Sequence, residues 1–419
     1  MDALKIQGGR LLTGEIHVSG SKNASLPIMA AALLAEGASI LKGAPKLADV
    51  HTLCQVLGHM GVGVTWEGSH LSLDATHIGQ QEAPYDLVRT MRASILVLGP
   101  LLARFGRAKV SLPGGCAIGA RPIDQHLKGL GQLGANISIE HGYVVAEAPN
   151  GLHAGEVIFD MPTVTGTENL MLAAALIDGK TQLRNAACEP EIVDLAVALG
   201  RMGAHIEGAG TEHIVITGQK KLKPFVHRVV ADRIECGTFL VAAALAGNPL
   251  TVVGGVAEHQ VALIGKLRAI GAQVDIEGER IRVQRPKQAK AVDIQTAPYP
   301  GIPTDMQAQL MALLSVAQGA SVITETIFEN RFMHVAELDR LGAHIRVEGK
   351  RAVVQGVQQL SGSTVMATDL RASACLVLAG LIADGETIVR RVYHLDRGYE
   401  QLEQKLAQTG AQIERIKQA

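Results

Sequence analysis

The segment Asn169–Ile177 reads NLMLAAALI, and Thr238–Ala246 reads TFLVAAALA. Both runs are apolar around the full circumference of a helix, which is typical of a helix buried on every side. Gly179 follows the first run and Gly247 follows the second, at the place where a glycine commonly ends a helix. The sequence therefore predicts a fold whose core is made of helices.

This pattern recurs six times at nearly constant spacing. The glycines that follow the apolar runs, which we call the first series, are Gly37, Gly106, Gly179, Gly247, Gly319 and Gly385. The glycines that end a second segment are Gly61, Gly134, Gly203, Gly271, Gly342 and Gly410. Both series have a period of about 70 residues, and two independent markers with one period predict six copies of one structural unit along the whole chain.

Each unit has the same expected content. A short strand such as Ser321–Ile323 follows the glycine, then an amphipathic helix, then a hairpin with alternating apolar residues. The expected hairpins include Ala204–Ile206 with His213–Ile216, and Ala343–Val347 with Ala352–Val354. Buried helices with strands outside would make an inside-out α/β barrel, and six units divide most simply into two lobes of three. The predicted fold class is therefore α/β.

The composition excludes several classes of function. Hydrophobic residues make up 47% of the 419 residues and aromatic residues only 3%, so the core must consist of Ala, Leu, Val and Ile. A net charge of −1 gives no electrostatic basis for binding nucleic acid or an anionic membrane. Neither Met1–Arg10 nor the short apolar run Ile95–Ala103 fits a signal peptide or a membrane span. We expect a cytoplasmic protein.

The five cysteines predict neither disulfides nor a zinc site. Their odd number argues against a disulfide framework, and no Cys-x-x-Cys pair or His-x-x-x-His spacing offers a metal site. Four of the cysteines are expected to be small core residues: Cys54, Cys188, Cys236 and Cys375.

The fifth, Cys116, lies in a stretch unlike the rest of the chain. Residues 111–124 read SLPGGCAIGARPID, with three glycines and two prolines, which predicts a loop. The cationic residues near it in sequence are Arg107, Lys109, Arg121 and His126. Neighbouring cations favour the reactive thiolate. The alternative is a surface turn with an incidental cysteine.

Polar residues recur at two addresses within the repeat. At the helix starts, at an almost constant spacing before a first-series glycine, stand Lys22, Arg92, Asp305 and Arg371. In the turns after the strands, Cys116 and Glu329 share one spacing beyond such a glycine, and Arg331 and Arg397 share another. We expect these groups to face one cleft, where helix N-termini would add positive charge for a ligand with several anionic groups.

Each of these residues also has a plainer interpretation. Asp305 and Asp369, which follow Thr304 and Thr368, are typical helix caps. The three arginines at 331, 371 and 397 are compatible with solvated surface charges, and Lys22-Asn23 with an ordinary turn.

The chain resembles the enolpyruvyl transferase family over essentially all of its length. The resemblance rests on five motifs: Gly20-Ser21-Lys22-Asn23-Ala24, Arg89-Thr90-Met91-Arg92-Ala93-Ser94, Pro113–Pro122, Pro303-Thr304-Asp305-Met306-Gln307 and Glu329-Asn330-Arg331-Phe332. It implies transfer of the enolpyruvyl group of phosphoenolpyruvate to the 3′-hydroxyl of UDP-N-acetylglucosamine with release of phosphate. That reaction is the first committed step of bacterial peptidoglycan synthesis, and so serves cell-wall formation, cell shape and division.

The resemblance also implies roles for individual residues. The phosphoenolpyruvate site would comprise Lys22, Asn23, Arg121 and Arg397. The sugar-nucleotide site would comprise Arg92, Arg121, Pro122, Ile123, Asp124, Gln125, Asp305 and Ile327. Cys116 would act as the acid, form a covalent phosphoenolpyruvate adduct and be the target of fosfomycin, while Asp305 would act as the base. Supporting residues would be Glu329, Arg331, Asp369 and Arg371.

No metal or organic cofactor is implied, and the partners would be the two small-molecule substrates. The lobes would be residues 22–230, and 1–21 joined to 231–419. Gln125 stands where some family members carry Leu, and Met161 where some carry Lys.

Three other functions compete with this interpretation. The sister transferase acts on shikimate 3-phosphate, but that group lacks the Pro-Gly-Gly-Cys loop. An inactive paralogue that binds a nucleotide sugar is disfavoured by the intact Lys22, Cys116, Asp305 and Arg397. A cysteine hydrolase needs a Cys–His–Asn arrangement, and His126 has no evident second partner.

Overall fold

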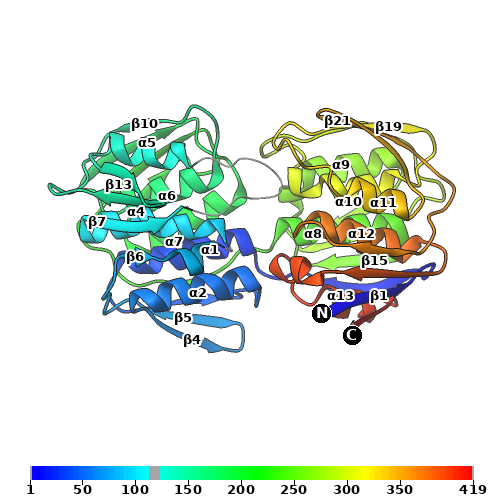
Figure 1. Ribbon diagram of the computed structural model, residues 1–419, viewed down its shortest axis with the longest axis horizontal. Helices are drawn as coiled ribbons and strands as arrows, with labels where there is room; N and C mark the ends of the chain where they lie inside the picture. Colours follow the sequence, from blue (N-terminus) through cyan, green and yellow to red (C-terminus); the bar gives the residue numbers. More distant parts are fainter. Residues whose placement is uncertain (1, 90, 113–122, 418–419) are drawn as a thin grey trace. The chain divides into compact units, whose positions relative to one another are not determined.

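The computed structural model describes residues 2–89, 91–112 and 123–417 (Figure 1). These residues form two compact units. The first, which we call the N unit, consists of the described residues between 20 and 230. The second, the C unit, consists of residues 2–19 and 231–417.

Each unit contains three four-stranded sheets, and all six sheets have the same topology. In one of them, β10 (Glu156–Ile158) pairs in parallel with β11 (Gly179–Arg184). Strand β11 pairs antiparallel with β13 (His213–Gly218), which pairs antiparallel with β12 (His205–Glu207). The six-fold repeat predicted from the glycines is confirmed.

The other sheets follow this order. In the N unit they are β14 (Val226–Arg228), β3 (Ala38–Lys42), β5 (His70–Asp74), β4 (Gly63–Glu67), and β6 (Glu82–Ala83), β7 (Arg107–Ser111), β9 (Tyr143–Glu147), β8 (Asn136–Glu140). In the C unit they are β2 (Leu12–His17), β15 (Gly247–Val253), β17 (Arg280–Gln284), β16 (Gln273–Glu277); then β18 (Ile294–Gln295), β19 (Ala320–Thr324), β21 (Arg351–Gln355), β20 (His344–Glu348); and β22 (Thr364–Met366), β23 (Glu386–Arg390), β1 (Asp2–Gln7), β24 (Gln412–Lys417). The expected hairpins are therefore present.

The N-terminal strands complete sheets of the C unit. Strand β1 lies between β23 and β24, so the blue and red ends of the chain share one sheet (Figure 1). Strand β2 precedes the first helix of the N unit but pairs with β15 in the C unit, whereas β14 precedes the first helix of the C unit but pairs with β3 in the N unit. Each of these edge strands is therefore the last strand of its own unit before the chain passes to the other.

Six central helices form the cores. They are α1 (Lys22–Ala31), α4 (Leu98–Phe105) and α6 (Val164–Ala174) in the N unit, and α8 (Arg233–Ala246), α10 (Gln307–Leu314) and α12 (Ala372–Ile382) in the C unit. Nearly every residue of α6 and α8 is buried, as their apolar runs predicted. Helices inside and strands outside are therefore confirmed. The six sheets stay separate, and no closed barrel forms within the described part of the chain.

The outer helices are α2 (Ala48–Met60), α5 (Asp124–Gln132), α7 (Pro190–Met202), α9 (Val261–Ile270), α11 (Val335–Arg340) and α13 (Leu402–Gln408), and α3 is the short turn Tyr85–Val88. Five 3₁₀ turns complete the helical structure: η1 (Ala32–Leu34), η2 (Arg92–Val97), η3 (Ala257–Gln260), η4 (Thr304–Met306) and η5 (Val392–Arg397).

The predicted cap role of the first-series glycines is mostly wrong. Gly106 caps α4 in the left-handed conformation and Gly247 caps α8 with an extended backbone, but α6 already ends at Ala174, well before Gly179. There the glycine has a positive φ and turns the chain into the following strand, a conformation that a side chain disfavours. The first-series glycines therefore mark strand starts more often than helix ends.

Both cores are aliphatic, as the low aromatic content predicted. Cys54, Cys236 and Cys375 are buried in them, whereas Cys188 is partly exposed and is not the core residue that was expected. Among the described helices, none has the length and apolar character needed to cross a membrane.

Candidate active site

Lys22 is the first residue of α1, as its address predicted. The helix begins at Ser21, whose hydroxyl oxygen accepts a hydrogen bond from the backbone N–H of Ala24 at 3.2 Å. Lys22 is buried, and its Nζ lies 3.2 Å from Oδ2 of Asp49, which is also buried. A buried ammonium and a buried carboxylate stabilise each other only as a pair, so Asp49 fixes the position of Lys22. Asn23, the next residue, is partly exposed.

The residues expected to bind the sugar nucleotide begin two other helices of the N unit. Arg92 is the first residue of η2, which leads into α4, and Asp124 is the exposed first residue of α5. Gln125 is buried: its Oε1 accepts from the backbone N–H of Asp160 at 2.9 Å, and its Nε2 donates to Oδ2 of Asp160 at 2.9 Å. Gln125 therefore joins the start of α5 to the loop that precedes α6. Ile123 is partly buried at the cap of α5.

His126 is part of a buried polar cluster rather than a cation. Its Nε2 lies 3.2 Å from Oγ1 of Thr165, and its Nδ1 lies 3.0 Å from Nδ2 of Asn169. Burial lowers the pKa of His126 to about 4, against an opposing effect of Asp124. The imidazole is therefore neutral at pH 7, and its expected contribution of positive charge near Cys116 is wrong.

In the C unit, Asp305 lies between two arginines. Its Oδ1 is 2.8 Å from Nη2 of Arg331, and its Oδ2 is 3.6 Å from Nε of Arg371. The Asp305 side chain is 25% exposed, whereas those of Arg331 and Arg371 are 3% and 1% exposed. Pro303 occupies the cap position of η4, so Asp305 acts as a charge partner instead of the predicted alternative cap. A held carboxylate with one accessible edge is suited to accept a proton.

The positive charge of Arg331 is stabilised despite its burial. Burial on its own would lower the pKa of Arg331, but the nearby carboxylates, chiefly that of Asp305, outweigh it and raise the pKa. The interpretation of Arg331 as a solvated surface charge is therefore wrong.

Arg371 is the largest fully buried side chain of the structure's described residues. Its Nη1 donates to the backbone carbonyl of Gly398 at 2.8 Å, and its Nη2 lies 3.5 Å from Oδ2 of Asp232. Burial opposes the charge, but Asp232, Tyr399 and Asp305 together raise the pKa of Arg371. Arg371, too, is not a solvated surface charge.

Asp369 has the plainer of its two predicted roles. Its Oδ1 accepts from the backbone N–H groups of Arg371 at 2.8 Å and Ala372 at 2.7 Å, which caps α12. This contact also fixes the backbone of Arg371, so the cap helps to hold the Arg371 side chain beside Asp305.

The remaining post-strand residues lie where the repeat predicted. Ile327 and Glu329 are exposed in the segment after β19, and Arg397 is the partly buried last residue of η5, after β23. The structure thus places one set of site residues in the N unit and another in the C unit. That all of them face one cleft stays a prediction.

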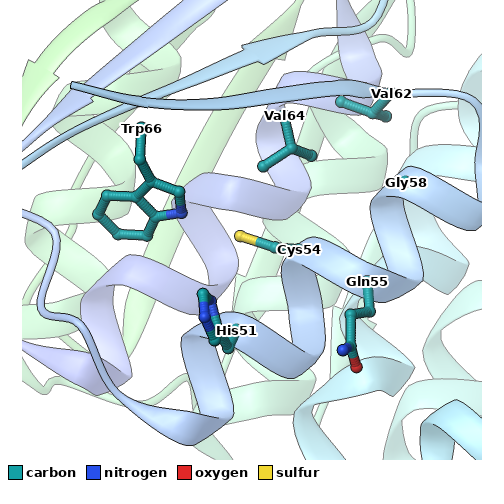
Figure 2. A pocket seen from close by; sticks show the side chains of 7 residues that line it. All are labelled: His51, Cys54, Gln55, Gly58, Val62, Val64 and Trp66. Atoms are coloured by element: carbon teal, nitrogen blue, oxygen red, sulfur yellow. The ribbon is translucent and has the colours of Figure 1, made fainter.

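Cys116, Arg121 and Pro122 lie outside the described residues. The other cysteines are informative by contrast. Cys54 lines a pocket of about 380 Å³ between α2 and β4, and Figure 2 shows its sulfur directed into the space between His51 and Trp66. Burial raises the pKa of Cys54 to about 11, and it also raises the pKa of Cys236 and Cys375. These thiols stay protonated at neutral pH and are poor nucleophiles.

Two charged residues of the site were missed from the sequence although they share the predicted addresses. Asp232 precedes Gly247 at the same spacing as Lys22 precedes Gly37. Asp49 follows Gly37 at the spacing that separates Arg331 and Arg397 from the first-series glycines of their own units. Comparing all six units at both addresses would have found them. In the described ranges no group of three or more His, Cys, Asp or Glu side chains is placed to hold a metal ion.

Comparison with known proteins gives one consistent result. The family model of EPSP synthase (3-phosphoshikimate 1-carboxyvinyltransferase) matches residues 6–406. The UDP-N-acetylglucosamine 1-carboxyvinyltransferase of Anaeromyxobacter dehalogenans is 61% identical over 421 residues, which cover 100% of both chains. Those of Trichlorobacter lovleyi and Myxococcus xanthus are 59% and 58% identical, with 99% and 100% of both chains covered.

Solved structures show the same fold. The enolpyruvyl transferase NikO from Streptomyces tendae superposes with a TM-score of 0.89 at 27% identity, over 100% of this chain and 99% of that one. EPSP synthase from Acinetobacter baumannii superposes with a TM-score of 0.76 over 100% of both chains. At 17% identity, the second likeness supports the fold alone.

Proposed function

The chain belongs to the enolpyruvyl transferase family, and we propose that it transfers the enolpyruvyl group of phosphoenolpyruvate to the 3′-hydroxyl of UDP-N-acetylglucosamine. One observation carries the proposal: relatives that are 55–61% identical over the whole chain bear the name UDP-N-acetylglucosamine 1-carboxyvinyltransferase. The product would be the first intermediate committed to peptidoglycan, made in the cytoplasm where both substrates would be available.

The reaction requires one proton donor, one proton acceptor and cations for two anionic groups. In the first step the Cys116 thiol gives its proton to C3 of phosphoenolpyruvate, which makes C2 electrophilic. The oxygen of the sugar hydroxyl then bonds to C2, and its proton passes to Asp305. In the second step C3 loses a proton to the site, the bond from C2 to the phosphate oxygen breaks, and the double bond forms again as phosphate leaves.

The charged residues would hold the two anionic groups of phosphoenolpyruvate. Lys22, Asn23, Arg121 and Arg397 are assigned to its phosphate and carboxylate, and a guanidinium group can bind either one through two hydrogen bonds. The burial of Lys22 against Asp49 supports the assignment, because a held ammonium needs little reorganisation when substrate arrives.

Asp305 suits the role of base by its position. Arg331 and Arg371 hold its carboxylate from two sides while one edge stays accessible. The sugar nucleotide is assigned to Arg92, Ile327 and Asp305, together with residues 121–125, of which the structure describes Ile123, Asp124 and Gln125. Glu329 and Asp369 complete the supporting set.

We further propose that the two lobes, residues 22–230 and residues 1–21 joined to 231–419, close over the substrates. Small-angle scattering of the whole chain should show a smaller radius of gyration after UDP-N-acetylglucosamine is added. An unchanged radius at saturating nucleotide sugar would refute closure and leave the reaction itself untouched.

The deciding experiment measures phosphate release from phosphoenolpyruvate with two acceptors. We expect release with UDP-N-acetylglucosamine and none with shikimate 3-phosphate. Release with shikimate 3-phosphate alone would keep the fold and overturn the substrate. No release with either would favour a protein that binds a nucleotide sugar without turnover.

Cys116 is tested with the same assay. Cys116→Ser should lose roughly 10²–10⁴-fold in rate, the usual contribution of a general acid, while Cys116→Asp should keep part of it because Asp can donate a proton. Fosfomycin should label the wild-type chain at Cys116 alone, since the buried thiols of Cys54, Cys236 and Cys375 stay protonated and partial burial beside Glu189 and Glu212 also raises the pKa of Cys188. Labelling elsewhere with activity intact would argue against this role.

A further inference from the structure

The segment that carries Arg397 is bounded by two unusual backbone conformations. Arg391, just before η5, has φ 57°, and Gln401, just before α13, has φ 50°. Both are in the left-handed region, which is unfavourable for residues with a Cβ atom. The two turns that bound residues 392–400 are therefore conformations that their local sequence disfavours, and contacts elsewhere must hold them.

Those contacts converge on the two residues that follow Arg397. The carbonyl oxygen of Gly398 accepts from Nη1 of Arg371 at 2.8 Å. The hydroxyl of Tyr399 lies 2.9 Å from Oγ1 of Thr238 and accepts from Nε2 of Gln309 at 3.1 Å. The Arg371 guanidinium also lies over the Tyr399 ring, 5.1 Å from its centre. We call these four side chains, Tyr399, Thr238, Gln309 and Arg371, the Tyr399 cluster.

The cluster draws on all three central helices of the C unit. Thr238 is on α8, Gln309 is on α10, and Arg371 is the residue that precedes α12. All four side chains are buried, and Tyr399 is 2% exposed. Burial raises the pKa of Tyr399 to about 12, so its hydroxyl keeps its proton over the neutral range. Breaking this contact would leave buried polar groups without partners, which strongly disfavours release of the segment.

Gly398 shows how closely the segment is held. A Cβ atom at this position would lie 2.9 Å from Cδ1 of Leu370 and 3.3 Å from Nη1 of Arg371. A side chain at position 398 would therefore require the Leu370 side chain to shift.

We propose that Tyr399 is a positioning residue: its buried hydroxyl anchors residues 392–400 on α8 and α10 and so holds Arg397 in place for phosphoenolpyruvate. The part of this inference that concerns phosphoenolpyruvate rests on the proposed function. The anchoring itself rests on the contacts within the C unit. Tyr399 acts through Arg397 and takes no part in the proton transfers.

The test compares Tyr399→Phe with Tyr393→Phe in the whole chain. Tyr393 lies in the same segment but is 50% exposed, so it is a matched control for loss of a phenol hydroxyl. Tyr399→Phe should raise KM for phosphoenolpyruvate roughly three- to tenfold, the factor expected from one net hydrogen bond. KM for UDP-N-acetylglucosamine should stay within about twofold, because the Tyr399 hydroxyl is bonded to Thr238 and Gln309, and Asp305 keeps its contact with Arg331 when that hydroxyl is removed. Tyr393→Phe should match the wild type in both constants.

Hydrogen–deuterium exchange of the same variants measures how firmly residues 392–400 are held, without any substrate. Peptides covering residues 392–400 should exchange faster in Tyr399→Phe, and peptides of the N unit should not change. Thr238→Val is a second variant that keeps the Tyr399 hydroxyl but removes its partner on α8, and it should shift exchange in the same direction.

The outcomes separate the two proposals. Unchanged exchange at residues 392–400 in both variants would overturn the anchor. Faster exchange with an unchanged KM for phosphoenolpyruvate would overturn the positioning role. A fall in kcat with both KM values unchanged would mean that Tyr399 does not act through phosphoenolpyruvate binding, which also overturns it. If the wild type itself shows no turnover of phosphoenolpyruvate, the proposed function fails, and exchange still decides whether Tyr399 anchors the segment.

Discussion

Each unit contains one buried carboxamide at the same place in its repeat, but the two make different contacts. Asn169 on α6 precedes Gly179 at the same spacing as Gln309 on α10 precedes Gly319. Both are fully buried. Asn169 accepts from the backbone N–H of Gly99 at 2.8 Å and donates to the carbonyl of Ile95 at 3.1 Å.

Gln309 contacts side chains instead of backbone. Its Nε2 donates to the hydroxyls of Thr238 at 3.2 Å and Tyr399 at 3.1 Å, and its Oε1 has no hydrogen-bond partner in the described part of the chain. At the same repeat position, the amide of the N unit therefore bonds backbone groups, which we call a backbone joint. The amide of the C unit bonds side-chain hydroxyls, which we call a side-chain anchor. A backbone joint contributes mainly to stability, whereas a side-chain anchor can be adjusted to hold a functional segment.

The largest expected effect is the loss of the backbone joint. Asn169→Leu, which keeps the size of the side chain, removes the partners of the Gly99 N–H and of Nδ1 of His126, whereas the Ile95 carbonyl still accepts from the backbone N–H of Leu98. We expect the free energy of unfolding to fall by about 2–5 kcal/mol, given about 1–3 kcal/mol for each unsatisfied group. Urea denaturation measures the change.

Gln309→Met is the matched control. The Thr238 and Tyr399 hydroxyls remain bonded to each other when the amide is gone. The cost should therefore stay below about 1.5 kcal/mol, the upper end of one net hydrogen bond. If Gln309→Met cost as much as Asn169→Leu, the distinction between joint and anchor would be lost.

Two buried histidines test the comparison through pH. Burial lowers the pKa of His126 in the N unit and of His334 in the C unit to about 4. His126 has side-chain partners on both ring nitrogens, whereas neither ring nitrogen of His334 has a side-chain partner among the described residues, and only the backbone of Arg331 interacts with it. Because the unfolded chain binds a proton near pH 6.5 and the folded chain does not, each histidine should lower stability as pH falls from 6.5 to 4. The slope is about 1.4 kcal/mol per pH unit for each.

The variants His126→Leu and His334→Leu should each remove one such slope when unfolding is followed between pH 7.5 and 5. At pH 7.5 they should differ: His126→Leu loses the contacts with Thr165 and Asn169, whereas His334→Leu loses no side-chain partner of a ring nitrogen within the described residues. Equal cost at pH 7.5 would contradict the assigned contacts. An unchanged acid slope in both would contradict the lowered pKa values.

The sequence was informative about local geometry. The six-fold repeat could be predicted because the glycine that ends the second segment, from Gly61 to Gly410, has a positive φ in every unit, and that requirement leaves a period in the sequence. Lys22, Arg92 and Asp305 were found at helix starts for the same reason: a position defined relative to a turn is preserved from unit to unit. Asp49 and Asp232 were predictable by this argument as well.

Long-range pairings left no such pattern. The strands β2 and β14 have ordinary strand sequences, and nothing local shows that β2 pairs with β15 and β14 with β3. The partners of Asn169 and Gln309 are 74 and 90 residues away in Ile95 and Tyr399. A buried amide has no sequence pattern that reveals its partner, so its role emerges only from the folded chain.

The smallest expected effect is one in which the variant of the C unit, and no longer that of the N unit, loses more stability. Thr238 is fully buried, and its hydroxyl lies 2.9 Å from that of Tyr399, while the hydroxyl of the partly exposed Thr165 lies 3.2 Å from Nε2 of His126. Thr→Val keeps the shape of either side chain. We expect Thr238→Val to cost about 1–2 kcal/mol and Thr165→Val no more than about 1 kcal/mol, because water can replace the partner only at the exposed position. Thermal unfolding of the two variants gives the ranking.

With Asn169→Leu the N unit loses more stability than the C unit does with Gln309→Met, and with Thr→Val the C unit should lose more. This reversal is expected only if the Asn169 amide contributes most to the buried polar contacts of the N unit, and the hydroxyls of Thr238 and Tyr399 contribute most to those of the C unit. A larger loss from Thr165→Val would mean that both clusters share one design.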